Sequence, residues 1–427
     1  MPYQEHAKKI RSAQEVAPLT SDLFGDSISP YNGSTEFSIV DVDLPGNNAL
    51  PVQVKRRFKI EPRSDLENFG GFGVWDLDIP YIHGNFDSQT KWNEWNSPGP
   101  DRRRCTPGRW GPPIPYPPFD IGDFYSGIRI HLPGVGDRDL LGVNSRNPHR
   151  PTDGASYPYV AQDFTSVTCV SGTTNGYPGE GFVVVTSDGT RYTLNAGRER
   201  GGGRLSRYLV SSIGANLRTR GRTQVFLMAS RVEDRHGNWV NYHYNDDRLV
   251  TIEASDGRRI DLGYSGNTIT QVTAHGRTWR YEYAPITFGL NLKNHLLTRV
   301  TRPDGSTWQY GYEDADGCTG VGMGCPGMLG PEYHQLDINT INDRNCPEPF
   351  PANDRFTFTA THPSGATGRF RFEYHRRYRT AVPFGSCVGS AIPSSPLFEY
   401  TLQIPDYFDL YTIEDKTLAG PGMAEQT

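Results

Sequence analysis

The sequence lacks the long apolar runs and the charge excess that would mark membrane or nucleic-acid proteins. No run of about 18 or more apolar residues is present to span a bilayer, and the first thirty residues contain no apolar core of a signal peptide. Lys and Arg number 43 against 48 Asp and Glu, so the net charge of −5 offers no strong basic field for nucleic acid. We expect no transmembrane segment, no nucleic-acid partner, and a cytoplasmic chain that reaches the exterior or the cell surface only by a non-classical route.

Cysteine is also scarce, with six residues in 427. Three of them lie close together in one Gly/Pro-rich stretch: Cys318, Cys325 and Cys346. The other three are far apart in the sequence: Cys105, Cys169 and Cys387. A disulfide between Cys318 and Cys325 is the candidate staple of that stretch if the protein is exported, with free thiols as the alternative. Zinc is a weaker alternative because the close pair spacing of structural zinc sites is missing. We therefore expect no metal and no cofactor.

Glycine, proline and aromatic residues are abundant. The chain has 47 Gly and 33 Pro, about a fifth of its length, together with 20 Phe, 23 Tyr and 7 Trp. So many Gly and Pro residues interrupt long helices, and so many aromatic residues exclude a disordered chain. An all-β fold of antiparallel hairpins fits both counts.

The N-terminal part divides into a lead-in and a β-rich region. Residues 1–30 are polar, with one short helix candidate from His6 to Val16, and we expect a mobile lead-in. Residues 31–180 form a β-rich, Pro- and aromatic-rich region, which opens with two apolar strands around the turn Pro45–Asn48. Between residues 70 and 151 the dense prolines favour edge strands and ordered loops, because proline cannot donate to a ladder.

Self-similar units begin at about residue 181 and predict a repeat sheet over 181–414, followed by a tail at 415–427. The units read VEDRHGNWVNYHY, IEASDGRRIDLGY, VTAHGRTWRYEY and VTRPDGSTWQYGY, with turn glycines at Gly237, Gly257, Gly276 and Gly305. Successive glycines lie 20, 19 and 29 residues apart. A period near twenty is typical of one hairpin per repeat, and insertions are expected near 284–296 and 313–354.

The positions three, five and seven residues past each glycine are predicted to share one buried face, because side chains in a strand alternate. Arg280 and Glu282 are then predicted to lie on the opposite, solvent-exposed face. The predicted repeat core consists of Val240, Tyr242, Tyr244, Ile260, Leu262, Tyr264, Trp279, Tyr281, Tyr283, Trp308, Tyr310 and Tyr312.

The Tyr-x-Tyr of the first unit, followed by the run from Asn245 to Leu249, resembles the YD repeat of RHS proteins. The segments Leu23–Phe37 and Asp41–Phe58 resemble the stretch that precedes the repeats in long bacterial RHS polypeptides. The repeat resemblance covers somewhat less than half of the chain. It implies a sheet that spirals into a partial or complete hollow shell, which in bacterial toxins encloses a C-terminal effector.

On this resemblance we expect a non-enzymatic scaffold, part of an encapsulating or cell-surface structure of a bacterial toxin or contact system. Its partners would be a toxin domain or further RHS repeats. The family's self-cleaving motif contains Asp-Pro, a dipeptide that this chain lacks, so self-cleavage is not expected. The alternative function is a carbohydrate-binding surface module that uses the aromatic loops of residues 75–116, with Trp92, Trp95 and Trp110 stacking on a surface glycan.

Sequence motifs for catalysis are weak. Residues 322–327 match GxGxxG, but Pro326 and the flanking cysteines predict a loop instead of a helix start. Cys387 has the spacing of a nucleophile elbow, yet it lies among prolines with no helix following. The basic run Arg198–Arg204 lacks the ending of a phosphate loop and predicts a flexible turn. No catalytic or cofactor-binding residue is therefore expected.

Overall fold

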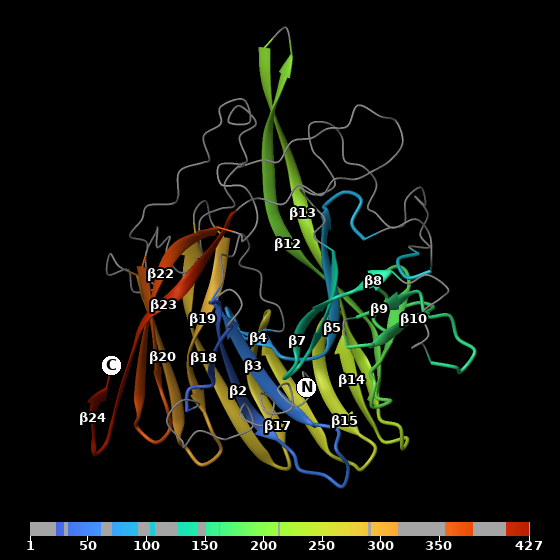
Figure 1. Ribbon diagram of the computed structural model, residues 1–427. Coiled ribbons are helices and arrows are strands. Elements are labelled where there is room, and N and C mark those ends of the chain that lie inside the picture. Colours follow the sequence, from blue (N-terminus) through green and yellow to red (C-terminus); the bar gives the residue numbers. More distant parts are fainter. Residues whose placement is uncertain are drawn as a thin grey trace, which may run out of the picture.

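The computed structural model describes residues 23–29, 33–60, 71–92, 103–106, 127–142, 151–161, 163–211, 214–288, 292–314, 355–378 and 407–426. Every regular element in these ranges is a strand, and the ladders are antiparallel. The all-β prediction is confirmed, and the strands build an extended, curved sheet of long hairpins (Figure 1). None of the elements in these ranges is a helix of the length and apolarity needed to cross a membrane.

The first four strands form a separate small sheet in the order β1-β2-β3-β4. Its strands are β1 (Asp26–Ile28), β2 (Thr35–Asp43), β3 (Gln53–Lys59) and β4 (Asp76–Leu77). The predicted pair of strands around the turn Pro45–Asn48 is confirmed as β2 and β3, which pair from Glu36↔Lys59 to Asp43↔Gln53. We call these four strands the N-terminal sheet.

The remaining strands belong to one large sheet. They are β5 (Tyr81–Asp87), β6 (Ile128–Leu132), β7 (Gly136–Asp139), β8 (Leu141–Gly142), β9 (Tyr159–Val160), β10 (Ser166–Val170), β11 (Gly181–Val185), β12 (Arg191–Ser211), β13 (Gly214–Glu233), β14 (Trp239–Asn245), β15 (Arg248–Ala254), β16 (Arg259–Ser265), β17 (Thr268–Ala274), β18 (Arg277–Phe288), β19 (Leu292–Thr301), β20 (Thr307–Asp314), β21 (Arg355–Thr361), β22 (Thr367–Tyr378), β23 (Tyr407–Gly420) and β24 (Met423–Gln426).

The large sheet branches at β13. This strand pairs with β12 along its length, with β5 over Arg222–Met228, and with β14 over Arg231–Glu233. From β14 onward each strand pairs with the next in chain order up to β24. The sheet therefore grows by addition of hairpins, as the sequence repeats predict.

Five hairpin loops of the large sheet share one backbone pattern. In each, the amide of the glycine donates to the carbonyl three residues earlier, and the loop's first amide donates to the carbonyl four residues on. The glycines have positive φ, as at Gly257 (85°) and Gly305 (82°), which an L side chain adopts only with strain. This geometry is a tight turn closed by a glycine bulge, and it explains the spacing of the repeats: the glycines are Gly189, Gly237, Gly257, Gly305 and Gly365.

The predicted repeat core lies on one face of the sheet. Eight of its members are buried: Val240, Ile260, Leu262, Trp279, Tyr281, Trp308, Tyr310 and Tyr312. The other four tyrosines, Tyr242, Tyr244, Tyr264 and Tyr283, are partly buried and pack against the same core. Arg280 and Glu282 are exposed on the opposite face. The register derived from glycine spacing therefore agrees with the structure.

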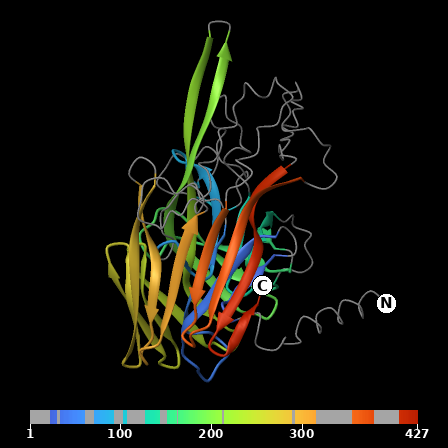
Figure 2. The same ribbon diagram turned by 90° about the vertical axis from the view of Figure 1, so that its left-hand side faces the viewer.

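The N-terminal sheet covers this aromatic face. Phe37 lies 4.6 Å from Phe358 and 4.8 Å from Phe370 between ring centroids, and Trp75 lies 5.1 Å from Tyr310. Figures 1 and 2 show the N-terminal sheet lying within the curve of the large sheet. The buried side chains of both sheets form one core, so the curve is occupied here by the chain's own N-terminal strands.

Several segments differ from the sequence-based division. Residues 198–204 were expected as a flexible turn but lie within β12, with a bulge between Gly201 and Arg204. Residues 284–296 mostly extend the β18–β19 hairpin, from Ala284↔Leu296 to Phe288↔Leu292. Residues 1–30 were expected as a mobile lead-in, but within the described part 23–29 Phe24 packs in the core and β1 pairs with β2. Residues 415–427, expected as a tail, include the end of β23 and β24. The helix candidate at residues 6–16 and most of the 313–354 insertion lie outside the described residues.

Candidate functional site

An arginine is completely buried between the two sheets, together with the groups that pair with it. Arg56 of β3 has no exposed surface, and its Nε donates to Asp41 Oδ2 of β2 at 2.7 Å. Its Nη2 donates to Asp41 Oδ1 at 3.2 Å and to the hydroxyl of Tyr310 in β20 at 2.6 Å. Tyr281 of β18 donates its hydroxyl to Asp41 Oδ2 at 3.0 Å. We call Asp41, Arg56, Trp75, Tyr281 and Tyr310 the Arg56 cluster.

Aromatic rings complete the surroundings of this guanidinium. The Arg56 Cζ lies 4.7 Å from the centre of the Trp75 ring and 5.0 Å from that of Tyr310, within reach of cation–π attraction. Burial by itself lowers the pKa of Arg56, but the Asp41 carboxylate and Tyr310 outweigh it and raise the pKa. Burial also raises the pKa of the Tyr310 hydroxyl. The cluster therefore holds one fixed ion pair, which joins the N-terminal sheet to two repeats.

A further hydrogen bond between the two sheets joins Trp75 to the repeats. Its Nε1 donates to the hydroxyl of Tyr312 at 2.8 Å, and that hydroxyl donates to the carbonyl of Leu297 at 2.9 Å. A buried polar group without a partner is costly, so these bonds fix which residues of the two sheets can face each other.

The bond from Tyr312 is one of four equivalent bonds. In successive repeats the last tyrosine of the unit donates to a backbone carbonyl of the preceding hairpin at 2.5–2.9 Å: Tyr244 to Ala229, Tyr264 to Leu249, Tyr283 to Ile269, and Tyr312 to Leu297. Each of these carbonyls belongs to the residue just before a β-bulge. The tyrosine therefore satisfies backbone next to a point where the bulge interrupts the ladder.

A second buried group of charges lies where the N-terminal sheet meets β6 and β7. His131 has its Nε2 2.7 Å from Asp78 Oδ1 and its Nδ1 2.8 Å from Asp137 Oδ1. Lys55 lies 2.9 Å from Asp78, and Arg57 lies 3.2 Å from His131 Nδ1. Burial alone raises the pKa of Asp78, but His131, Arg57 and Lys55 together outweigh it, and the pKa falls to about 2. We call these five residues the His131 cluster.

His83 packs beside the His131 cluster. Its ring stacks on that of Phe226, with centroids 5.5 Å apart and planes 6° from parallel. Burial lowers the pKa of His83 to about 3, although Asp137 nearby opposes this shift. His83 is therefore neutral at ordinary pH, while Asp78 stays charged, so a neutral imidazole lies beside the cluster.

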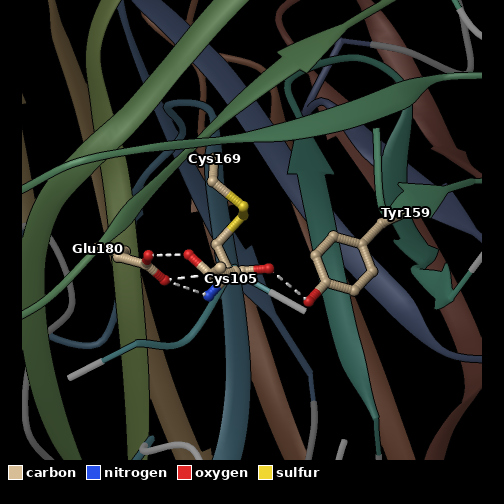
Figure 3. Close-up of a disulfide and its surroundings, with 5 residues drawn as sticks. Cys105, Tyr159, Cys169 and Glu180 are labelled. Carbon is tan, nitrogen blue, oxygen red and sulfur yellow. Dashed lines mark hydrogen bonds between the residues drawn. A yellow bond between two sulfur atoms is a disulfide. The ribbon is translucent and has the colours of Figure 1, made fainter. Parts of the chain in front are cut away.

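The structure contains a disulfide that sequence reasoning did not identify. Cys105 and Cys169 are bonded, across 64 positions of sequence. Figure 3 shows Glu180 beside this bond, accepting from the Cys105 and Thr106 amides at 2.9 Å each and from the Thr106 hydroxyl. Tyr159 donates to the Cys105 carbonyl at 2.9 Å. Partial burial raises the pKa of Glu180, but the bonds from Thr106 and Cys105 outweigh it and lower that pKa.

The other predicted site residues fall in different places. Trp92 is buried, with its ring 5.0 Å from Phe86 and 5.3 Å from Phe182, so it presents no open face to a sugar. The remaining candidates lie outside the described residues: Trp95, Trp110, Cys318 and Cys325. Cys387 lies outside them as well.

Sequence reasoning missed the Arg56 cluster, although a signal was present. Arg56 and Asp41 both lie in segments of strand character, in the runs KRRF and VDVD. A charge inside an alternating apolar strand indicates a buried partner, but the partner's identity is not given by the strand. Within the ranges that the structure describes, no group of three His, Cys, Asp or Glu residues is placed to hold a metal ion.

Comparisons with known proteins add no family assignment. A scan against protein-family models finds no match to this chain, and a search of curated proteins finds none either.

Proposed function

We propose that this chain is a non-enzymatic RHS/YD-repeat scaffold, part of an encapsulating or cell-surface structure of a bacterial toxin or contact system. The observation that carries the proposal is the repetition itself. From β14 on, the hairpins share one buried face, and several share the glycine turn and the tyrosine–carbonyl bond. A sheet that grows by equivalent units and curves as it grows is suited to forming a wall.

The charged groups between the sheets support a scaffold more than an enzyme. The Arg56 cluster is buried, and its carboxylate and guanidinium are bonded to each other and to tyrosines. Groups held in this way fix one sheet on another, whereas a catalytic group must reach a substrate. Their role in the proposal is to anchor the N-terminal sheet in the curve of the wall.

The described residues offer no observation in favour of the carbohydrate-binding alternative, and two of its three tryptophans, Trp95 and Trp110, lie outside them. It requires aromatic rings that lie open to a sugar, and Trp92 is packed between two phenylalanines. We therefore propose the scaffold and keep the carbohydrate module as an alternative outcome of its test.

Protease protection tests it. The chain is co-expressed with the polypeptide encoded directly downstream, and the purified complex is digested with trypsin beside the downstream polypeptide alone. We expect the downstream polypeptide to survive much longer in the complex, because a surrounding wall excludes the protease.

Two variants sharpen this test. Arg56→Met loosens the N-terminal sheet and should reduce the protection, whereas Arg280→Met on the exposed face should leave it unchanged. Equal digestion of the downstream polypeptide with and without the scaffold would refute encapsulation. Glycan-array binding by the chain alone would instead favour the carbohydrate module.

A further inference from the structure

The hairpin of β12 and β13 extends past all the other described strands (Figures 1 and 2). Its outer part begins beyond Gly221, whose carbonyl accepts from the Ser88 amide at 2.9 Å. From there seven cross-strand pairs run from Leu205↔Arg220 to Ser211↔Gly214. At about 3.3 Å per residue this part is roughly 20 Å long. We call residues 205–211 and 214–220 the arm.

The arm is two strands wide. Nearer the body β13 lies between β12 and β5, which pairs with it up to Arg222↔Asp87. Farther out, the ladders found in the described part of the chain join the two arm strands only to each other. A two-stranded hairpin is marginally stable by itself in water, and each open edge presents backbone donors and acceptors to a further strand.

The arm is also basic within an acidic chain. Residues 200–222 contain six arginines and no Asp or Glu, although the whole chain has a net charge of −5. The register places Arg207 directly opposite Arg218. Like charges opposite each other destabilise a strand pair, and an anionic partner relieves that repulsion. At the base of the arm Arg220 already pairs with Asp87, at 3.1 Å between Nη2 and Oδ1.

We propose that the arm binds an extended acidic segment of a partner protein, which adds to its open edge as a third strand. Backbone pairing supplies part of the affinity and the arginines select for carboxylates, as in other cases of strand addition. A membrane is the competing partner for a basic hairpin, but open strand edges are costly in hydrocarbon because their backbone groups lose all partners. The inference is independent of encapsulation, since the arm projects away from the curve that holds the N-terminal sheet.

Peptide binding to the full chain tests the proposal. The probe is a fluorescent peptide of about ten residues that alternates valine and glutamate, the pattern of a short strand with one acidic face. A second peptide has the same sequence with every backbone nitrogen methylated, which keeps the charge and removes the donors. We expect saturable binding of the first peptide and loss of binding with the second. Hydrogen exchange should slow at the amides of residues 205–220 when the first peptide binds.

The matched protein variants are Arg207→Gln with Arg218→Gln, and Arg280→Gln with Arg369→Gln, which removes the same charge from exposed repeat positions. The first pair should weaken binding by at least about tenfold and the second should not. Equal binding of the methylated peptide would overturn strand addition in favour of simple charge attraction. Binding to vesicles of anionic lipid without peptide binding would overturn it in favour of a membrane. Absence of binding to both the peptide and the vesicles would overturn the proposal without supporting either partner.

Discussion

The Arg56 cluster gives the sharpest test of how the two sheets are held together. Changing Arg56 to methionine keeps a long flexible side chain against Trp75 but removes the guanidinium. The side chain of the Asp41 carboxylate is 1% exposed, and among the described residues it would keep a single side-chain donor, the hydroxyl of Tyr281. An ionised carboxylate in such surroundings is strongly disfavoured, because its desolvation is no longer compensated.

The expected loss is large. Removing one partner of a buried ion pair typically costs about 3 to 5 kcal/mol of unfolding free energy. Arg56 makes three hydrogen bonds and two ring contacts, so a value in this range is expected. Combining Arg56→Met with Asp41→Asn removes both charges, and the double variant should lose at least about 1.5 kcal/mol less than the two single losses summed.

Urea unfolding followed by tryptophan fluorescence and by circular dichroism measures these values. The control is Arg259→Met, which breaks the exposed Arg259–Asp261 pair at 2.8 Å and should cost far less, because water screens an exposed ion pair. A loss at Arg56 as small as that at Arg259 would refute the claim that the buried pair fixes the N-terminal sheet. Strict additivity of the two single variants would refute the direct coupling of Arg56 with Asp41.

Three further outcomes are expected. Trp279→Ala removes a buried ring and should cost about 3 to 5 kcal/mol of unfolding free energy, whereas Arg280→Ala should cost at most about 1 kcal/mol. If chemical denaturation shows the larger loss at Arg280, the assigned strand register is wrong by one residue. Tyr312→Phe removes the hydroxyl that accepts from Trp75 and donates to Leu297, and it should cost about 2 to 3 kcal/mol of unfolding free energy. Tyr264→Phe breaks one hydrogen bond and should cost about 1 kcal/mol. Equal losses for the two variants in the same assay would contradict the bridging role of Tyr312. Burial holds the pKa of His83 at about 3, below its unfolded value of 6.5, so the unfolded chain gains a proton first as pH falls. Stability from this group is complete above pH 6.5 and falls by up to about 1.4 kcal/mol per pH unit between pH 6.5 and 3. His83→Gln should therefore flatten the slope in unfolding measured from pH 7 to 4, and an unchanged slope would show that His83 gains its proton at the same pH in the folded and unfolded chains.

The sequence alone determined the hairpins and their faces. A glycine with positive φ is needed wherever the tight turn closes, so Gly257 and Gly305 mark the loops without any knowledge of the rest of the fold. Counting from those glycines assigns Trp279 and Tyr310 to the buried face, because alternation along a strand is a local property. The strands on either side of the turn Pro45–Asn48 were predictable for the same reason.

The tertiary structure decided what covers that face and which distant residues meet. Arg56 bonds Tyr310 across 254 positions, and Cys105 is linked to Cys169 although the other four cysteines offered more compact pairings. The length of the β12–β13 hairpin could not be predicted from the sequence either, because the glycines at 201–203 predict a turn where the chain forms a bulged strand. Turns and alternation depend on the φ and ψ of a few neighbouring residues. The pairing of buried charges, cysteines and sheets depends on the three-dimensional path that brings remote segments together, and local sequence pattern does not specify that path.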